Sequence, residues 1–384
     1  MKIALPNEKG RLSPYTLKGK PFRPRAPKAT FNRIAFAAAH VVADPFSASH
    51  PAGRPAIDWQ KTLAYRHYLL DQGFGIAEAM DTSQRGMGLD WLSAHELIQR
   101  SLKSAGKKAK LIASGVGTDH LNPADARDLD DVIKAYLDQL HAVQKLGGRV
   151  IMMASRALVK VARSPDDYVK VYSRVLSEAD APVILHWLGE MFDPALKGYW
   201  GGGAFSQTME TCLAVINDNE RQVDGIKISL LDDQKEVVMR RRLPRMVKMY
   251  TGDDFNYPAL IKGDAQGYSH ALLGIFDAIA PAAAAGLEAL AKGDTGRYSS
   301  IMNATVPLSR LIFRSPTQFY KTGVVFLAWL NGHQDHFVMV GGAQSARPLP
   351  YFVEAFKLAD KAGLLAKPGL AIKRMKQLLA LYGA

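Results

Sequence analysis

Val223-Asp224-Gly225-Ile226-Lys227-Ile228-Ser229 is the stretch around which the rest of the chain can be arranged. Its Val and Ile residues predict a short β-strand buried between apolar layers. A lysine inside such a strand is unfavourable unless it has a partner or a chemical task. Burial of an amine favours its neutral form, and a neutral amine can attack a carbonyl group to form a Schiff base. The competing interpretation is an edge-strand lysine that reaches into water.

On both sides of this stretch, strand patterns alternate with helix patterns. Strands are predicted at residues 33–42, 75–80, 110–114, 149–154, 182–186, 223–229, 247–251 and 268–272. Helices are predicted at residues 57–71, 89–104, 164–176, 205–216, 234–243, 257–262 and 275–292, with a further one from Asn122, its expected N-cap, to the glycines at 147 and 148. Eight such units favour parallel strands with right-handed crossovers that close into a (β/α)₈ TIM barrel.

An open, doubly wound α/β sheet is the alternative architecture. That fold favours a glycine-rich turn after its first strand, and Ala43-Asp44-Pro45-Phe46 is not such a turn. The alternation stops near residue 292, and helices are then predicted at 298–313, 317–330, 350–364 and 372–381. We therefore expect a surface arm at residues 1–32, the barrel at 33–292 and a C-terminal helical extension at 293–384.

Composition limits the classes of function. The 384 residues carry a formal charge of +13, but the basic residues are scattered, and the densest run, Arg240-Arg241-Arg242-Leu243-Pro244-Arg245, ends a predicted helix without interleaved aromatics. Such a run is typical of a solvated helix end and does not indicate nucleic-acid binding. The start lacks the apolar core of a secretory signal, and no apolar run is long enough to span a membrane. With Cys212 as the single cysteine, we expect a cytoplasmic protein.

Polar residues occupy the predicted carboxyl ends of the strands, which meet at one end of a barrel. They are His40, Asp44, Asp81-Thr82-Ser83, Thr118-Asp119-His120, Ser155-Arg156, His186, Lys227, Asp253-Asp254 and Ser269-His270. Each alone is more often a helix cap or a satisfied core group, but their recurrence favours a catalytic role for Lys227. His186, His270, Asp253 and Asp81 offer ligands to a divalent metal, but no His-x-His or His-x-x-x-His pair stands at a strand end, so no metal requirement is expected.

The order of these motifs resembles the dihydrodipicolinate synthase / N-acetylneuraminate lyase family of class I aldolases, in a divergent branch known as domain of unknown function 993. Gly225-Ile226-Lys227 is similar to the family's Gly-Ile-Lys strand, and Asp81-Thr82-Ser83-Gln84-Arg85 falls on its Gly-Thr-Thr-Gly-Glu loop. Ile112-Ala113-Ser114-Gly115-Val116-Gly117, Tyr250-Thr251-Gly252-Asp253-Asp254 and Ile57-Asp58-Trp59 resemble further motifs of the family. The chain departs from it where His186 stands for a proton-relaying tyrosine and Ala154-Ser155-Arg156 for a Tyr-Tyr pair.

The resemblance implies a Schiff-base lyase or aldolase acting on a 2-keto acid or a sugar-derived carbonyl compound, without a cofactor other than the lysine imine. Lys227 would form the imine, and His186 would carry the proton. Substrate-binding roles are expected for Thr82 and Ser83 on a carboxylate, for Arg156 on a second polar group, and for Asp81, Ser155, Asp253 and His270 around them. The partner would be a small-molecule substrate, in a homodimer or homotetramer.

Two other functions stay open on the residues alone. One is a barrel epimerase or isomerase of sugars, with or without a metal, in which Lys227 acts as a base. The other is a non-catalytic protein that binds a keto acid or sugar, because both family tyrosines are replaced.

Overall fold

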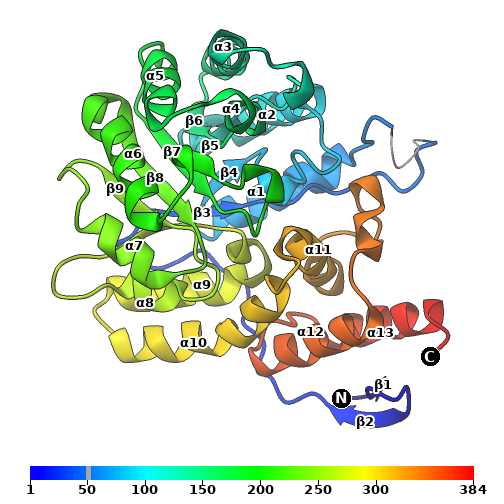
Figure 1. The fold of residues 1–384 in the computed structure, drawn as a ribbon. Coiled ribbons are helices and arrows are strands. Elements are labelled where there is room, and N and C mark those ends of the chain that lie inside the picture. Colours follow the sequence, from blue (N-terminus) through cyan, green and yellow to red (C-terminus); the bar gives the residue numbers. More distant parts are fainter. Residues whose placement is uncertain (49–52) are drawn as a thin grey trace.

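The computed structural model describes residues 1–48 and 53–384. Eight parallel strands close into a barrel in the order β10-β3-β4-β5-β6-β7-β8-β9, which confirms the TIM barrel and excludes the open sheet (Figure 1). The strands are β3 (Ala35–Ala38), β4 (Gly75–Glu78), β5 (Ile112–Val116), β6 (Arg149–Met152), β7 (Val183–Leu188), β8 (Val223–Ser229), β9 (Lys248–Thr251) and β10 (His270–Leu273). The closed order leaves no free sheet edge in the barrel, so Lys227 is not on an edge strand.

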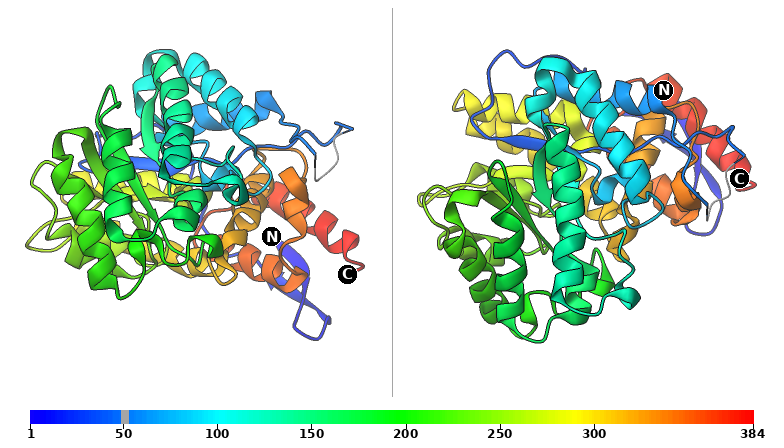
Figure 2. Two further views of the ribbon diagram at one scale, coloured as in Figure 1. Left: turned by 45° about the horizontal axis from the view of Figure 1, so that its top comes forward. Right: turned by 90° about the horizontal axis from the view of Figure 1, so that it is seen from above.

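Helices surround the strands on the outside of the barrel (Figures 1 and 2). They are α1 (Trp59–Asp71), α2 (Trp91–Ala105), α3 (Leu129–Lys145), α4 (Arg156–Val161), α5 (Pro165–Leu176), α6 (Phe205–Asp218), α7 (Asp233–Arg240), α8 (Tyr257–Lys262) and α9 (Ile275–Ala291). Aspartates begin several of them: Asp58 accepts from the Lys61 amide at 2.9 Å and Asp90 from the Ser93 amide at 2.7 Å. These caps satisfy amides that the first helical turn leaves free.

The helix expected to begin at Asn122 begins later. Asn122 does accept from the Ala124 amide at 3.0 Å, but it caps only a short 3₁₀ turn at Pro123–Asp125. Ala126 is extended, and Asp128 starts α3 by accepting from the amides of residues 130 and 131. An N-capping residue therefore occurs twice here, at Asn122 and at Asp128, and the second one begins the long helix.

The C-terminal region forms four helices on one side of the barrel, shown in yellow, orange and red in Figure 1. They are α10 (Thr295–Ile312), α11 (Tyr320–Asn331), α12 (Leu349–Lys361) and α13 (Pro368–Leu381), close to the predicted ranges. All ten residues of α11 from Lys321 to Leu330 are buried, so every side of this part of the helix is covered by protein. A helix that is apolar all round packs inside the protein, so α11 is a part of the molecular core and not a surface addition.

The N-terminal segment contains a hairpin that the sequence analysis did not predict. Strands β1 (Lys2–Pro6) and β2 (Leu12–Thr16) pair antiparallel and lie near α12 and α13 (Figure 1). Asp360 on α12 accepts from the Tyr15 hydroxyl at 2.8 Å and from the amides of Lys18 and Gly19 at 3.0 and 3.1 Å. One carboxylate therefore joins the two ends of the chain.

Glu236 on α7 is a buried carboxyl group that couples stability to pH. Burial raises its pKa to about 8, and hydrogen bonds such as that from Ser269 at 2.7 Å offset this only in part. Between the unfolded pKa near 4.5 and about 8, the folded state binds a proton that the unfolded state lacks, so stability falls as the pH rises. We expect Glu236→Gln to be more stable than the parent by a few kcal/mol at pH 8 and nearly equal to it at pH 4, as measured by denaturant unfolding. Equal stability at pH 8 would contradict a protonated Glu236.

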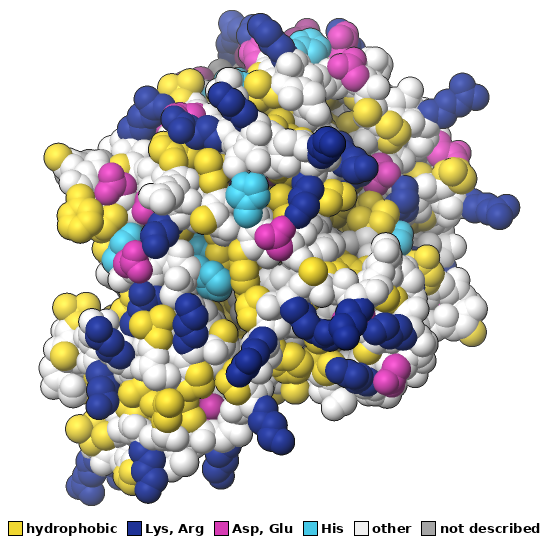
Figure 3. Space-filling model, turned by 180° about the vertical axis from the view of Figure 1, so that it is seen from behind, with side chains coloured by type: hydrophobic (Ala, Val, Ile, Leu, Met, Phe, Trp, Pro, Cys, Tyr) yellow, Lys and Arg dark blue, Asp and Glu magenta, His cyan; other side chains and the backbone are white. Residues whose placement is uncertain are grey.

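The surface carries its positive charge in many places. Figure 3 shows Lys and Arg side chains spread over the whole face in view, with apolar and uncharged groups between them. Within residues 1–48 and 53–384, no helix is both long enough and apolar enough to cross a membrane.

Candidate active site

Lys227 faces the interior of the barrel near the carboxyl end of β8. Tyr250 on β9 belongs to the apolar cluster inside the barrel, and a Cβ at Gly225 would lie 2.6 Å from its ring. Gly225 therefore faces inward, and side chains two residues apart in a strand share a face. Lys227 is only 4 % exposed. Gly252 makes room for it, because a Cβ there would lie 2.8 Å from Lys227 Cε.

His186 lies beside Lys227 in the neighbouring strand. The two residues are register partners between β7 and β8, and Ile184, two residues earlier, belongs to the interior cluster. His186 Nε2 is 3.2 Å from the hydroxyl oxygen of Ser229. Burial, reinforced by the positive charge of Lys227, holds the pKa of His186 well below its usual value. The imidazole is therefore neutral at pH 7 and keeps one nitrogen able to accept a proton.

Asp81 follows β4 and brings a carboxylate to the same place. Burial alone would raise its pKa, but the charges of Lys227 and Lys321 outweigh burial and set the pKa to about 2. Asp81 Oδ2 accepts from the Tyr320 hydroxyl at 2.7 Å. Its Oδ1 is shielded from solvent and has no hydrogen-bond donor in the described ranges. The site thus contains a permanent anion with one unsatisfied oxygen.

Tyr320 and Lys321 at the start of α11 reach the site from the C-terminal region. The Tyr320 hydroxyl is 2.7 Å from both Asp81 Oδ2 and Thr82 Oγ1. Burial lowers the pKa of Lys321 to about 8 although Asp81 opposes the shift, and its amine donates to Met87 Sδ at 3.2 Å and to the Gln318 carbonyl at 3.3 Å. Neither residue was predicted from the sequence. The signal that could have identified them is the position of Lys321 at the start of a long apolar run, where a charged side chain is unusual.

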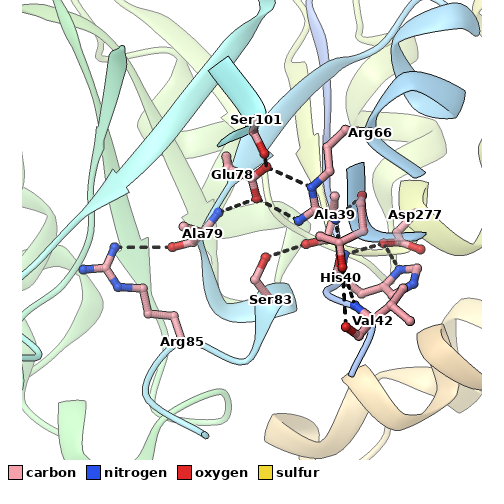
Figure 4. Close-up of polar contacts among 11 residues, drawn as sticks. Ala39, His40, Val42, Arg66, Glu78, Ala79, Ser83, Arg85, Ser101 and Asp277 are labelled. Carbon is pink, nitrogen blue, oxygen red and sulfur yellow. Dashed lines mark hydrogen bonds and ion pairs between the residues drawn. The ribbon is translucent and has the colours of Figure 1, made fainter. Parts of the chain in front are cut away.

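Both hydroxyl groups of the loop after β4 have partners within the protein. Ser83 Oγ donates to the Ala39 carbonyl at 2.6 Å (Figure 4). An ionised Asp81 can only accept, so the Tyr320 proton lies on the bond to Asp81, and Thr82 donates to the Tyr320 oxygen. The structure places Thr82 and Ser83 next to the site, but neither has a free proton for a substrate carboxylate.

Figure 4 also shows how the end of β4 is fixed. Arg66 on α1 forms a bidentate ion pair with Glu78, with Nε–Oε2 and Nη2–Oε1 distances of 2.9 and 2.8 Å. Ser101 Oγ and the Ala79 amide donate to the same carboxylate at 2.6 and 2.9 Å, and Arg66 also donates to the His40 carbonyl. Because Glu78 is the last residue of β4, this buried network orients the loop that carries Asp81.

A cavity of about 990 Å³ opens at this end of the barrel. Of the polar residues predicted to gather there, those that line it are Asp81, Thr118, Asp119, His120, Arg156 and His186. Arg156 is half-exposed and pairs with Asp193, with Nε–Oδ2 at 2.6 Å. Ser155 is buried and caps α4 by accepting from the Leu158 amide at 2.9 Å, so the structure gives it a structural contact and not a place on the cavity wall.

One predicted substrate contact, His270, needs correction, and a second, Asp253, stays a prediction. His270 is the first residue of β10 and not its last, so it lies at the opposite end of the barrel, where its Nδ1 accepts from the Ile34 amide at 3.0 Å. Asp253 uses both carboxylate oxygens locally, on the amides of Phe255 and Asn256 and on the Asn256 side chain. Its neighbour Asp254 interacts electrostatically with Lys227, and burial raises the pKa of Asp254 well above its usual value.

No group of three or more His, Cys, Asp or Glu side chains is arranged to hold a metal ion within the part of the chain that the structure describes. His186 and Asp81, two of the residues considered as ligands, lie near each other, whereas His270 is at the other end of the barrel.

Removing the Tyr320 hydroxyl tests its contacts with Asp81 and Thr82. Tyr320→Phe leaves Asp81 Oδ2 without its donor, so we expect the free energy of unfolding to fall by about 1–3 kcal/mol in denaturant titrations at pH 7. Tyr382→Phe is the matched control, because Tyr382 is 44 % exposed, and it should leave the stability unchanged. Equal stabilities of the two variants would show that the Tyr320 contacts do not form in solution.

A family model described as "Protein of unknown function (DUF993)" matches residues 3–384. The chain belongs to the DUF993 family. Among curated proteins, none matches it significantly.

Several solved structures share the fold of this DUF993 chain. YagE, a prophage protein of Escherichia coli K12 from the dihydrodipicolinic acid synthase family, solved in complex with pyruvate, matches with a TM-score of 0.67 and 12% identity over 87% of this chain and 99% of its own. Dihydrodipicolinate synthase from Thermotoga maritima matches with a TM-score of 0.65 and 15% identity over 88% and 100%. The chloride-inhibited dihydrodipicolinate synthase from Acinetobacter baumannii, complexed with pyruvate, matches with a TM-score of 0.64 and 14% identity over 86% of this chain and 99% of its own. At these identities the likeness shows the fold alone.

Proposed function

We propose that this DUF993 protein is a class I lyase or aldolase that forms a Schiff base between Lys227 and a 2-keto acid or a sugar-derived carbonyl substrate. The observation that carries the proposal is the pairing of Lys227 with His186 across β7 and β8, at the end of the barrel where the cavity opens. A buried amine beside a neutral imidazole is the arrangement that imine chemistry needs.

The proposed reaction begins with proton removal from the Lys227 ammonium by His186. The free amine attacks the carbonyl carbon, and the carbonyl oxygen leaves as water after gaining two protons, one from the amine nitrogen and one from the imidazolium. The resulting iminium withdraws electrons from the adjacent carbon, so a bond to that carbon can break or form. The carboxylate of Asp81 stabilises the positive charge of the iminium.

The cavity supports a substrate larger than the reacting carbonyl group. Lys227 does not itself line the cavity, so a carbonyl would reach its amine past Asp81 and His186, which do. Arg156 on the same wall is placed to bind a second polar part of the substrate. We propose that no cofactor beyond the lysine imine takes part, and that the protein works as a homodimer or homotetramer, which light scattering would measure.

Borohydride reduction tests the proposal. Incubation with pyruvate, other 2-keto acids and short hydroxyketones, each followed by reduction, should add the mass of at least one reduced compound to the protein, and peptide mapping should locate it on Lys227. If no compound adds mass although one binds tightly, the proposal fails and a carbonyl-binding protein without catalysis is favoured. Adducts on surface lysines alone would also contradict it.

A further inference from the structure

The loop after β4 presents a negative charge to the space beside Lys227. Asp81 lines the cavity, is close enough to Lys227 to respond to its charge, and stays ionised at neutral pH. A negative charge in a poorly solvated site repels a substrate carboxylate and attracts hydrogen-bond donors. Asp81 Oδ1 is a buried acceptor without a donor in residues 1–48 and 53–384, and an incoming hydroxyl group would satisfy it.

Most donors of the same loop already have partners within the protein. The protons of the Thr82 and Ser83 hydroxyl groups lie in hydrogen bonds to Tyr320 and to the Ala39 carbonyl. The amides of Ser83, Gln84 and Arg85 donate to the carbonyls of residues 80 and 81.

Arg85, the only cationic side chain of this loop, is also engaged. Its guanidinium bonds Asp119 at 2.6 and 3.1 Å and also donates to Gln139. A carboxylate next to the reacting carbonyl would therefore meet the Asp81 carboxylate and few free donors of this loop, while the nearby Lys321 amine already donates to Met87 Sδ and to the Gln318 carbonyl.

We propose that the substrate of this site is an α-hydroxy ketone or hydroxy aldehyde of the sugar type, whose hydroxyl group next to the carbonyl donates to Asp81, and not a 2-keto acid. This inference rests on the proposed imine chemistry at Lys227 and selects between the two substrate classes that the chemistry allows. Asp81 then determines specificity by charge, because it accepts from a hydroxyl and repels a carboxylate.

Hydroxyacetone and pyruvate form a matched pair of probes. Both are three-carbon methyl ketones, and they differ only in the hydroxymethyl or carboxylate group beside the carbonyl. Each would be reduced with borohydride on the wild-type protein, and the yield on Lys227 would be divided by the yield on free Nα-acetyl-lysine under the same conditions. This normalisation removes the difference in intrinsic reactivity between the two ketones.

For the wild-type protein, the normalised yield with hydroxyacetone should exceed that with pyruvate by roughly tenfold or more. Asp81→Asn keeps the size of the side chain and an oxygen for Tyr320, so it should lower this ratio by roughly tenfold. The ratio is the readout, since the charge of Asp81 stabilises the iminium of either ketone. Asp218→Asn, an exposed residue of α6, should leave the ratio unchanged.

The outcomes separate the inference from the proposed function. A wild-type ratio that favours pyruvate, with the adduct on Lys227, would overturn the inference and leave the imine chemistry standing. Adducts on Lys227 with neither probe, nor with any larger hydroxyketone or keto acid, would overturn both. Should Asp81→Asn fail to fold, the wild-type ratio alone still decides.

Discussion

Replacing Lys227 with alanine is expected to reduce the borohydride-trapped adduct to background and to lower turnover of a carbonyl substrate by roughly 10³-fold or more. The reason is that, among the residues that the structure describes, no other amine lies in register with His186 inside the barrel. Lys227→Arg should be as inactive as alanine, although it retains the positive charge, because a guanidinium stays protonated and cannot attack a carbonyl.

Lys248 supplies the matched control for this prediction. It is also a strand lysine, at the start of the adjacent β9, but it is half-buried and pairs with Asp224 at 2.9 Å at the opposite end of the barrel. Lys248→Ala should keep the full adduct yield. If Lys227→Ala still gains a mapped adduct on Lys321, the other buried lysine near the site, then Lys321 and not Lys227 is the reactive amine.

Arg66→Met is expected to destabilise the protein by about 3–5 kcal/mol, because it leaves Glu78 as an uncompensated buried charge. The exposed fraction is 2 % for the Arg66 side chain and 0 % for that of Glu78, so water cannot replace the lost partner. Thermal and denaturant unfolding of the variant measure the loss. Since Glu78 ends β4, we also expect a lower adduct yield on Lys227 in protein that remains folded.

A second substitution distinguishes lost pairing from a general packing defect. Arg66→Met combined with Glu78→Gln removes the lone charge. The amide oxygen of the glutamine still accepts from the Ala79 amide and its NH2 group donates to Ser101 Oγ, so the double variant should recover a large part of the loss. Arg127→Met breaks an exposed pair with Asp131 and should cause no measurable change. Should the double variant be as unstable as Arg66→Met, packing and not the buried charge would account for the effect.

The barrel could be predicted because its evidence is local. Each strand is a short apolar run with polar residues after it, and each helix has an apolar stripe with a cap, so eight units are visible without any knowledge of contacts. Lys227 and His186 were placed correctly at one end for the same reason, since both stand near the end of a clearly bounded strand. Their roles in catalysis stay predictions.

Errors arose where a shift of two residues in a predicted strand boundary changes the end of the barrel to which a side chain is assigned. Tyr268 and Ser269 suit a strand by residue type, but the Ser269 amide donates to Leu260, and β10 begins only at His270. Because the strand was predicted to begin two residues too early, His270 was assigned to the carboxyl end of the barrel, although it lies at the opposite end. Asp253 and Asp254 differ by one position, and only the packing shows that the first caps a loop while the second is fully buried and interacts electrostatically with Lys227.

Tyr320 could not be assigned to the site from local pattern. Its hydroxyl meets Asp81 across 239 positions of sequence, through the packing of α11 against the barrel. Long-range contacts of this kind depend on tertiary structure, and periodicity within α11 reports only that the helix is buried. The consequence is chemical: the C-terminal region supplies a phenol and an amine beside Asp81.

A crystal structure of the protein soaked with hydroxyacetone or pyruvate and reduced with borohydride tests the central claim most directly. The account predicts continuous electron density from Lys227 Nζ to the former carbonyl carbon, with His186 and Asp81 beside it. Density that is separate from Lys227, or continuous with Lys321 instead, would contradict the account.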